Sequence, residues 1–145
     1  MPHGLAVAEV VLACILLIAL VPVVWLVARR RWLAHAGWVF DCSLRRSDAT
    51  PGSWMLGVAR LNGEAIEWYR VFSWSLRPKY VLRRGETQVS ASRVLDPDER
   101  ALLFDQERVV GLEGDGLRVE LAMAPPRMTA FLSWLESAPP GASYR

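Results

Sequence analysis

The chain has 145 residues, of which 52% are apolar, with a formal net charge of +2 and a mean hydropathy of +0.19. This length accommodates one domain of ordinary size and excludes two. The same composition excludes a disordered chain, a collagen-like repeat and a small scaffold held together by disulfides.

An apolar stretch, residues 5–28, follows a short N-terminus of residues 1–4, and Glu9 is its one charged side chain. The uncharged part, Val10 to Ala28, would span roughly 28 Å as a helix, which matches a hydrocarbon core of about 30 Å. We therefore predict a transmembrane helix over residues 5–28, with Glu9 at the interface and a kink at Pro22.

Two processing alternatives compete with a retained anchor, and neither is favoured. A signal peptide would need a basic region before the apolar stretch and small residues after it, where Arg29, Arg30 and Arg31 stand instead. A lipoprotein acylation site at Cys14 would lie in the middle of the stretch, with 14 membrane-compatible residues behind it.

The three arginines after the apolar stretch predict its orientation. By the positive-inside rule they stay in the cytoplasm, so the N-terminus lies outside and the remaining chain inside. Cys42 is then an unpaired cysteine in a reducing compartment. The 16 arginines against one lysine suggest a GC-rich bacterial genome. We expect a single-pass protein of the bacterial cell (plasma) membrane.

Beyond the anchor, residues 29–37 are predicted to be a basic juxtamembrane joint, residues 38–138 a cytoplasmic domain and residues 139–145 a tail. Short segments of alternating hydrophobicity, separated by turn signals, are typical of antiparallel β structure. Asn62-Gly63 and Asp115-Gly116 each predict a hairpin, and a turn at Arg84-Gly85 is predicted to join the strands 80–83 and 87–95 in a third. The predicted strands are 38–45, 54–60, 64–72, 80–83, 87–95, 108–113 and 117–123.

Two helical segments accompany these strands. Asp96-Pro97-Asp98-Glu99 is typical of a helix start and predicts one short turn. Apolar residues at helical spacing predict a longer helix over 126–137. A lone helix with one apolar face can cover the open end of a curled sheet. We therefore predict a pleckstrin-homology (PH)-like barrel of about seven antiparallel strands capped by a C-terminal α-helix, and neither a flat sheet nor an immunoglobulin-like sandwich.

Several blocks of sequence, behind one N-terminal anchor, resemble a known family. They are FDCSLR (residues 40–45), GVAR (57–60), EWYRVFSWSLRP (67–78) and FLSWLESAPPG (131–141). The chain resembles, over essentially its whole length, the actinobacterial membrane-protein family catalogued as domain of unknown function (DUF) 2550. The resemblance implies no activity and no catalytic residues.

A search of the residues for chemistry yields no catalytic, metal-binding or cofactor-binding site. His3 and His35 fall on opposite sides of the predicted membrane, and no cysteine or histidine pair has ligand spacing. Cys42 lacks a basic partner and is expected to be an inert strand residue. The acidic set near the helix start lacks the pattern of a calcium loop, so a solvated helix start is favoured; it comprises Asp96, Asp98, Glu99, Asp105 and Glu107. We expect a protein that is not an enzyme.

Charge is distributed unevenly along the chain. Residues 29–84 hold 11 basic and 4 acidic side chains, a net of +7, whereas residues 85–145 hold 6 and 10, a net of −4. Each basic residue near an anionic leaflet contributes about 1 kcal/mol to the free energy of membrane binding. The candidate contacts with anionic lipid or a partner are Arg29, Arg30, Arg31, Arg77, Lys79, Arg83 and Arg84.

Each basic set also has a simpler interpretation. The three arginines after the anchor can be topology determinants and nothing more. The second basic set comprises Arg70, Arg77, Lys79, Arg83 and Arg84. The aromatic residues among them, Trp68, Tyr69 and Trp74, can be core residues, with the basic side chains pointing outward. Nucleic acid is the least favoured partner.

The function that these features favour is a non-enzymatic, membrane-tethered binding or scaffolding module with a PH-like domain. The alternative is a structural accessory subunit of a larger membrane complex, recruited through its transmembrane helix. The expected partners are the bilayer, anionic phospholipid headgroups and a protein in a membrane complex, without any cofactor.

Overall fold

The computed structural model of the protein describes residues 2–35, 37–104 and 106–137. The chain divides into two compact units, Met1–Ala36 and Gly37–Arg145. The predicted tail, residues 139–145, and the last residue of the predicted domain, residue 138, lie outside the described residues.

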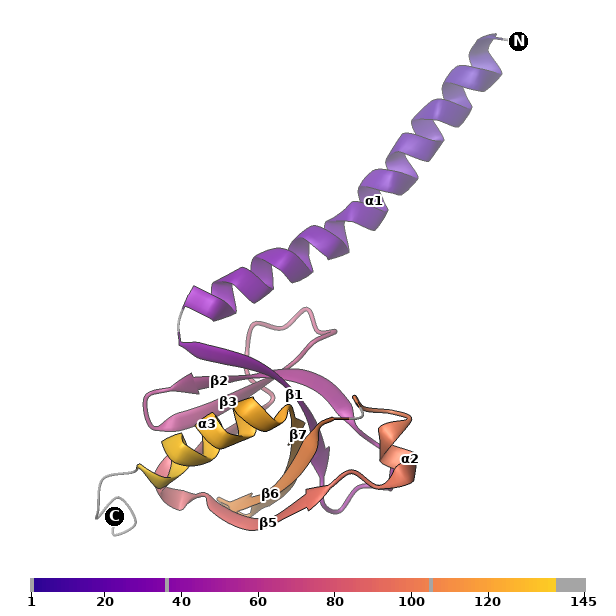
Figure 1. The fold of residues 1–145 in the computed structure, drawn as a ribbon. Helices are drawn as coiled ribbons and strands as arrows, with labels where there is room; N and C mark the ends of the chain where they lie inside the picture. Colours follow the sequence, from indigo (N-terminus) through magenta and orange to yellow (C-terminus); the bar gives the residue numbers. More distant parts are fainter. Residues whose placement is uncertain (1, 36, 105, 138–145) are drawn as a thin grey trace. The chain divides into compact units, whose positions relative to one another are not determined.

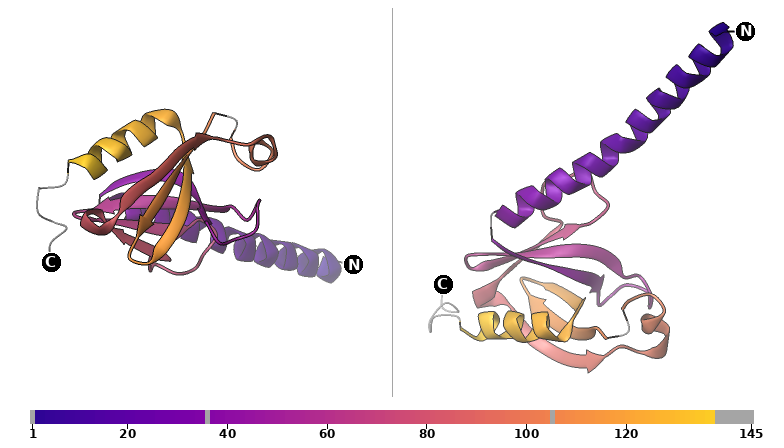
Figure 2. Two further views of the ribbon diagram at one scale, coloured as in Figure 1. Left: turned by 90° about the horizontal axis from the view of Figure 1, so that it is seen from below. Right: turned by 45° about the horizontal axis from the view of Figure 1, so that its top comes forward.

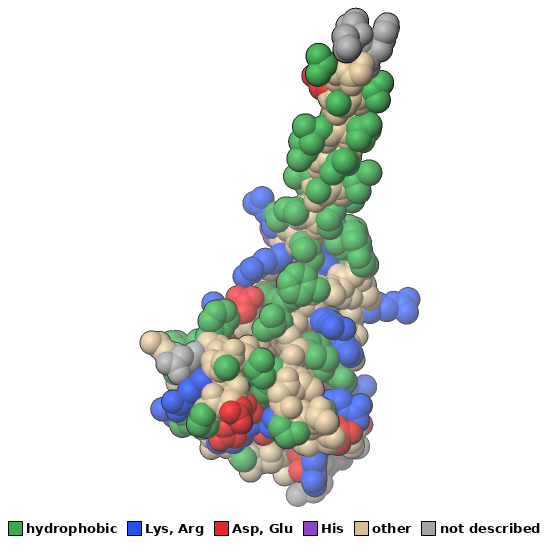
Figure 3. All heavy atoms as spheres, turned by 90° about the vertical axis from the view of Figure 1, so that its right-hand side faces the viewer, with side chains coloured by type: hydrophobic (Ala, Val, Ile, Leu, Met, Phe, Trp, Pro, Cys, Tyr) green, Lys and Arg blue, Asp and Glu red, His purple; other side chains and the backbone are tan. Residues whose placement is uncertain are grey.

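The first unit is a single helix, α1, Pro2–His35 (Figure 1). Its segment Gly4–His35 is long and apolar enough to cross a membrane, with a mean hydropathy of 3.2 in its most apolar window. Hydrophobic side chains project along the visible length of this helix (Figure 3). The helix continues through Pro22 and through most of the predicted joint, because residues 23–35 contain neither glycine nor a second proline.

The second unit contains seven strands and two α-helices among its described residues. Its elements, in chain order, are β1 Trp38–Arg46, β2 Met55–Asn62, β3 Ala65–Arg70, β4 Tyr80–Arg83, the 3₁₀ turn η1 Arg84–Glu86, β5 Gln88–Val94, α2 Pro97–Arg100, β6 Arg108–Gly114, β7 Leu117–Met123 and α3 Pro125–Glu136.

The strands form one antiparallel sheet in the order β4-β3-β2-β1-β7-β6-β5. The sheet curls, and α3 lies against its open side (Figures 1 and 2). β4 and β5 are the end strands, and η1 begins the connection between them. The predicted hairpin across Arg84-Gly85 is therefore wrong, because β4 pairs with β3 and β5 pairs with β6 at the opposite end of the sheet. The β5–β6 register shifts between Val89 and Ala91. This is the predicted PH-like arrangement of seven strands and a C-terminal helix.

The core lies between the sheet and α3, entirely within the second unit. Phe131 of α3 is fully buried, with its ring centroid 6.0 Å from that of Phe40. Trp68 is also buried, and its indole Nε1 donates a hydrogen bond of 3.3 Å to the carbonyl oxygen of Cys42. A Cβ at Gly57 would lie 2.1 Å from the Trp68 ring, so the ring requires glycine at this position. Because its core is self-contained, we expect the second unit to fold without α1.

The strand boundaries follow the predictions closely, with one informative difference. The strands predicted at 80–83 and 117–123 are found at those residues, and both hairpin turns form with Gly63 and Gly116 at positive φ. β3, however, ends at Arg70, although we predicted a strand to residue 72. The residues from Val71 to Lys79 therefore form a loop between β3 and β4.

Candidate functional site

The basic residues predicted as contacts fall in both units. Arg29, Arg30 and Arg31 lie in α1, near its C-terminal end. The other four follow β3: two in the β3–β4 loop, one at the end of β4 and one in η1. They are Arg77, Lys79, Arg83 and Arg84, and the structure gives them different surroundings.

The structure corrects the expectation that Arg84 points outward, because its side chain is only 8% exposed. Its Nη2 donates a hydrogen bond of 2.6 Å to Ser137 Oγ, and its guanidinium lies 4.8 Å from the Trp134 ring centroid. Its Nη1 is 3.7 Å from Glu64 Oε1. These contacts fasten η1 to the end of α3, so the charge of Arg84 acts within the fold.

Arg77, Lys79 and Arg83 are exposed. Among the described residues, neither Arg77 nor Lys79 has an ion-pair partner, and Lys79 Nζ approaches only Met55 Sδ, at 3.5 Å, and the Tyr80 ring. Arg83 has one distant partner, Glu86, at 3.9 Å. Their charges are therefore largely uncompensated within the described residues.

The β3–β4 loop exposes apolar side chains beside these bases. Phe72 is 72% exposed, Trp74 66% and Leu76 42%. We expected Trp74 to be a core aromatic, and this expectation is wrong, whereas Trp68 and Tyr69 are buried as expected. The alternation of the strand continues in the sequence past Arg70, but the strand itself ends there, so the later aromatics no longer face the core.

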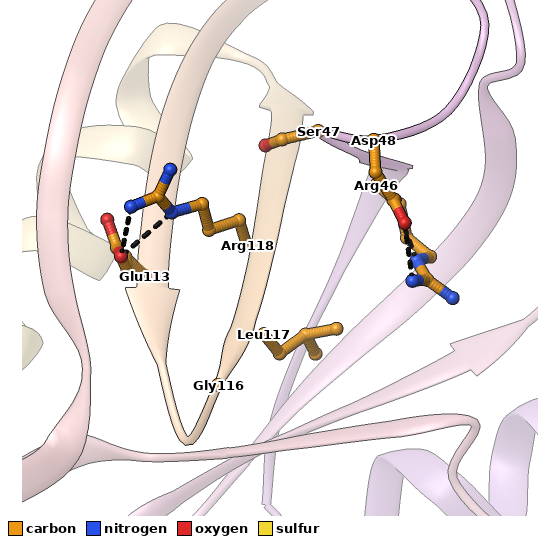
Figure 4. Close-up of a pocket in the computed structure, with 7 residues that line it drawn as sticks. All are labelled: Arg46, Ser47, Asp48, Glu113, Gly116, Leu117 and Arg118. Atoms are coloured by element: carbon orange, nitrogen blue, oxygen red, sulfur yellow. Dashed lines mark hydrogen bonds and ion pairs between the residues drawn. The ribbon is translucent and has the colours of Figure 1, made fainter.

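A surface depression lies at the end of β1, between the β1–β2 loop and the β6–β7 hairpin (Figure 4). It has a volume of about 370 Å³ and is lined by Arg46, Ser47, Asp48, Glu113, Gly116, Leu117 and Arg118. Arg46 Nη2 lies 2.7 Å from Asp48 Oδ2, and Arg118 Nη2 lies 2.7 Å from Glu113 Oε1. Both cations are thus neutralised by a neighbour, which weakens any attraction for an anion.

A second group of charges is internal and joins four elements. Arg93 of β5 donates to both carboxylate oxygens of Glu99 in α2, at 2.6 and 2.8 Å. Arg45 of β1 lies 3.2 Å from Glu99 and also pairs with Glu120 of β7. The hydrogen bonds from Arg93 hold the pKa of Glu99 at about 2. This group stabilises the fold.

The acidic residues around α2 were expected to be a solvated helix start, and Glu99 departs from that expectation. It is buried, and with Asp96 it forms a capping box at the helix N-terminus. Asp105, which belongs to the same acidic set, lies outside the described residues.

A further polar cluster joins β2 and β3, and two of its side chains, Arg60 and Tyr69, are buried. Arg60 Nε and the Tyr69 hydroxyl donate to Glu67 Oε2 at 2.9 and 2.7 Å, and Asn62 Nδ2 donates to Glu67 Oε1 at 3.2 Å. Partial burial raises the pKa of Glu67, but the hydrogen bonds from Tyr69, Arg60 and Asn62 outweigh it and hold the pKa below its ordinary value. An acid held ionised by three donors is suited to fixing strand geometry and unsuited to proton transfer.

The only thiol in the described part of the second unit is that of Cys42. It is buried, and burial raises its pKa to about 12. The thiol is therefore neutral at physiological pH and is a poor nucleophile. Within the described ranges, no group of three or more His, Cys, Asp or Glu residues could hold a metal ion.

Sequence reasoning missed two of these features, the exposed aromatic loop and the depression beside β1. The depression depends on the pairing of Arg46 with Val119, which lie far apart in the chain. The loop had a partial signal, since Ser73, Ser75 and Pro78 interrupt the apolar pattern after β3.

Comparison with known proteins yields one family and several relatives. The family described as "Protein of unknown function (DUF2550)" matches residues 16–141. An uncharacterized protein of Mycobacterium leprae is 36% identical over 90 residues, and one of Mycobacterium tuberculosis is 34% identical over the same length. Each match covers 59% of this chain and 61% of the relative, so the chain spans less than two thirds of these relatives.

Among solved structures, the chain is similar to the C-terminal PH domain of the human FYVE, RhoGEF and PH domain containing protein 3. The TM-score is 0.48 at 18% sequence identity, and the match covers 72% of this chain and 91% of that domain.

Proposed function

The chain belongs to the DUF2550 family of unknown function, and from that premise we propose that it is a non-catalytic binding module tethered to a membrane by α1. The anchor part of the proposal is supported by length. The 32 residues Gly4–His35 span about 48 Å as a helix, more than a hydrocarbon core of about 30 Å. Only residues 36 and 37 separate α1 from β1.

The orientation that we propose places the PH-like domain in the cytoplasm. Arg29, Arg30 and Arg31 follow the most apolar part of α1 directly, and clustered arginines favour the cytoplasmic side of a membrane. Since the cytoplasmic leaflet carries anionic lipids, the domain would then face a negatively charged surface.

One observation carries the proposed binding role: the stretch from Val71 to Gly85 contains basic residues and no acidic residue. Its three exposed bases, at about 1 kcal/mol each, would contribute about 3 kcal/mol toward an anionic leaflet. Alone, this corresponds to an affinity weaker than millimolar. A short tether supplies an effective concentration in the millimolar range, so contacts of this strength can orient a domain that is already anchored.

The non-catalytic part of the proposal is supported by the state of the reactive groups. The Cys42 thiol is buried and protonated, Glu99 is ionised and fully engaged by arginines, and the cations of the depression beside β1 are paired. A nucleophile next to a base is the minimum for covalent catalysis, and these groups do not supply one.

Sedimentation with lipid vesicles tests the lipid contact directly. Residues 37–145 should sediment with vesicles that contain anionic lipid at 0.1 M salt and much less at 1 M salt, where screening shortens the Debye length from about 10 Å to about 3 Å. The triple variant Arg77→Gln, Lys79→Gln, Arg83→Gln should sediment much less at 0.1 M salt. The matched control, with Arg108, Arg118 and Arg127 changed to Gln, removes the same number of charges and should still sediment with the vesicles.

Exchange of the anchor separates a binding module from an accessory subunit. Replacing residues 1–28 by an unrelated transmembrane helix should leave the partners recovered from mild detergent unchanged. Loss of those partners, with the domain still folded and in the membrane, would favour an accessory subunit recruited through α1.

A further inference from the structure

The tip of the β3–β4 loop presents three apolar side chains at alternate positions: Phe72, Trp74 and Leu76. Each is exposed, and Phe72 is among the most exposed large hydrophobic residues of the second unit. Exposed apolar side chains grouped in one loop are unfavourable in water, and they commonly mark a surface that contacts a partner or a membrane. Tryptophan and phenylalanine are also the side chains that favour the boundary between lipid headgroups and acyl chains.

The two serines between these apolar residues satisfy backbone groups of the loop. Ser73 Oγ accepts a hydrogen bond from the N–H of Ser75 at 3.2 Å, and Ser75 Oγ accepts one from the N–H of Arg77 at 3.1 Å. The N–H of Ser73 donates to the carbonyl oxygen of Val71 at 3.1 Å. Because unsatisfied N–H groups are costly in a water-poor environment, these three internal hydrogen bonds lower the cost of moving the loop into one.

The base of the loop carries positive charge. Arg77 and Lys79 are exposed and directly follow the apolar tip, and Lys79 is fixed by the hydrogen bond of 2.8 Å from its N–H to the carbonyl oxygen of Trp68. An apolar tip with cations at its base complements a bilayer in which anionic headgroups surround acyl chains. A water-soluble protein partner would give no such reason for this order of apolar and basic residues.

We propose that residues 72–76 insert into the interfacial zone of the bilayer that α1 spans, so that the domain is held to the membrane at a second point. The inserted side chains lie about 5–10 Å below the headgroup surface, at the boundary with the acyl chains. This inference rests on the proposed function, because it requires the domain to face the lipid. It adds a contact that salt does not screen.

Depth-dependent quenching in the full-length protein tests the insertion. A Cys14→Ser, Phe72→Cys variant, reconstituted into nanodiscs with anionic lipid, is labelled at residue 72 with an environment-sensitive fluorophore; the buried thiol of Cys42 does not compete. Nitroxide quenchers are placed on the headgroup, high on the acyl chain or near its end. Cys14→Ser, Ser133→Cys, labelled on the exposed face of α3, is the matched control.

Insertion predicts strongest quenching of the residue 72 label by the nitroxide high on the acyl chain, a blue-shifted emission that persists at 1 M salt, and little quenching at residue 133. Quenching by the headgroup nitroxide alone would overturn the insertion and leave the proposed lipid contact standing. Quenching by none of the three nitroxides would overturn both the insertion and the proposed lipid contact. A blue shift without lipid quenching would place the label against protein and not lipid and would also overturn the insertion, and equal quenching at both labels would refute a specific role for the loop.

Discussion

Replacing Phe131 by alanine tests whether α3 is an integral part of the domain. The ring is fully buried, with its centroid 6.0 Å from that of Phe40 and 6.3 Å from that of Trp134. Truncation removes these contacts and leaves a cavity, at a cost of about 3–5 kcal/mol. A domain of this length has a total free energy of unfolding of roughly 5–15 kcal/mol, so the variant should lose a large share of its stability.

Urea denaturation of residues 37–145, followed by tryptophan fluorescence and far-UV circular dichroism, measures this loss. With a slope near 2 kcal/mol per M, the midpoint should fall by roughly 1.5–2.5 M. Arg127→Ala, an exposed change in the same helix, should alter the free energy of unfolding by no more than about 0.5 kcal/mol. A Phe131→Ala midpoint equal to that of the unchanged domain would refute the docking of α3 and the core built on it.

Three further predictions concern protonation, reactivity and topology. The pKa of Glu99 is lowered to about 2 from 4.5, so its stabilising contribution is complete above pH 4.5 and is lost as the pH falls toward 2. The stability of Glu99→Gln should therefore depend less on pH in this window than that of Glu86→Gln, the control at an exposed site. Cys42 should resist maleimide at pH 8 in the folded domain and react rapidly in urea, and equal rates would contradict its burial. In a Cys14→Ser background, a cysteine at Gly4 should react with an impermeant maleimide on intact cells and one at Ser133 only after permeabilisation; the reverse pattern would invert the orientation.

Much of the fold could be predicted because local signals and tertiary structure agree. The strand Leu117–Met123 follows an Asp-Gly turn and alternates cleanly, so its bounds were predicted without error. α3 shows the same agreement, since Met128, Phe131 and Leu135 lie at helical spacing and are the residues that it buries. In these elements the sequence pattern and the buried face coincide.

The candidate site was less predictable, because its properties arise from contacts between distant residues. Arg84 is a charged residue in a turn, a position that is usually exposed. Only the position of α3 shows that its guanidinium contacts Trp134 and Ser137. Phe72 and Trp74 continue the alternation of β3 in the sequence, and nothing local distinguishes a strand that ends from one that continues. The spacing of apolar residues along the sequence predicts which residues could be buried. Whether a residue is in fact buried depends on which other elements pack against it.

The shift in register between Val89 and Ala91 has a consequence for crowding in the membrane plane. β5 is an end strand, and no strand among the described residues pairs with its outer edge. Proteins anchored in one bilayer meet at high local concentration, where a straight open edge would template pairing between copies. Under the proposed anchoring, the bulge interrupts the row of backbone donors and acceptors that such pairing requires, so that copies in one membrane would not join their sheets.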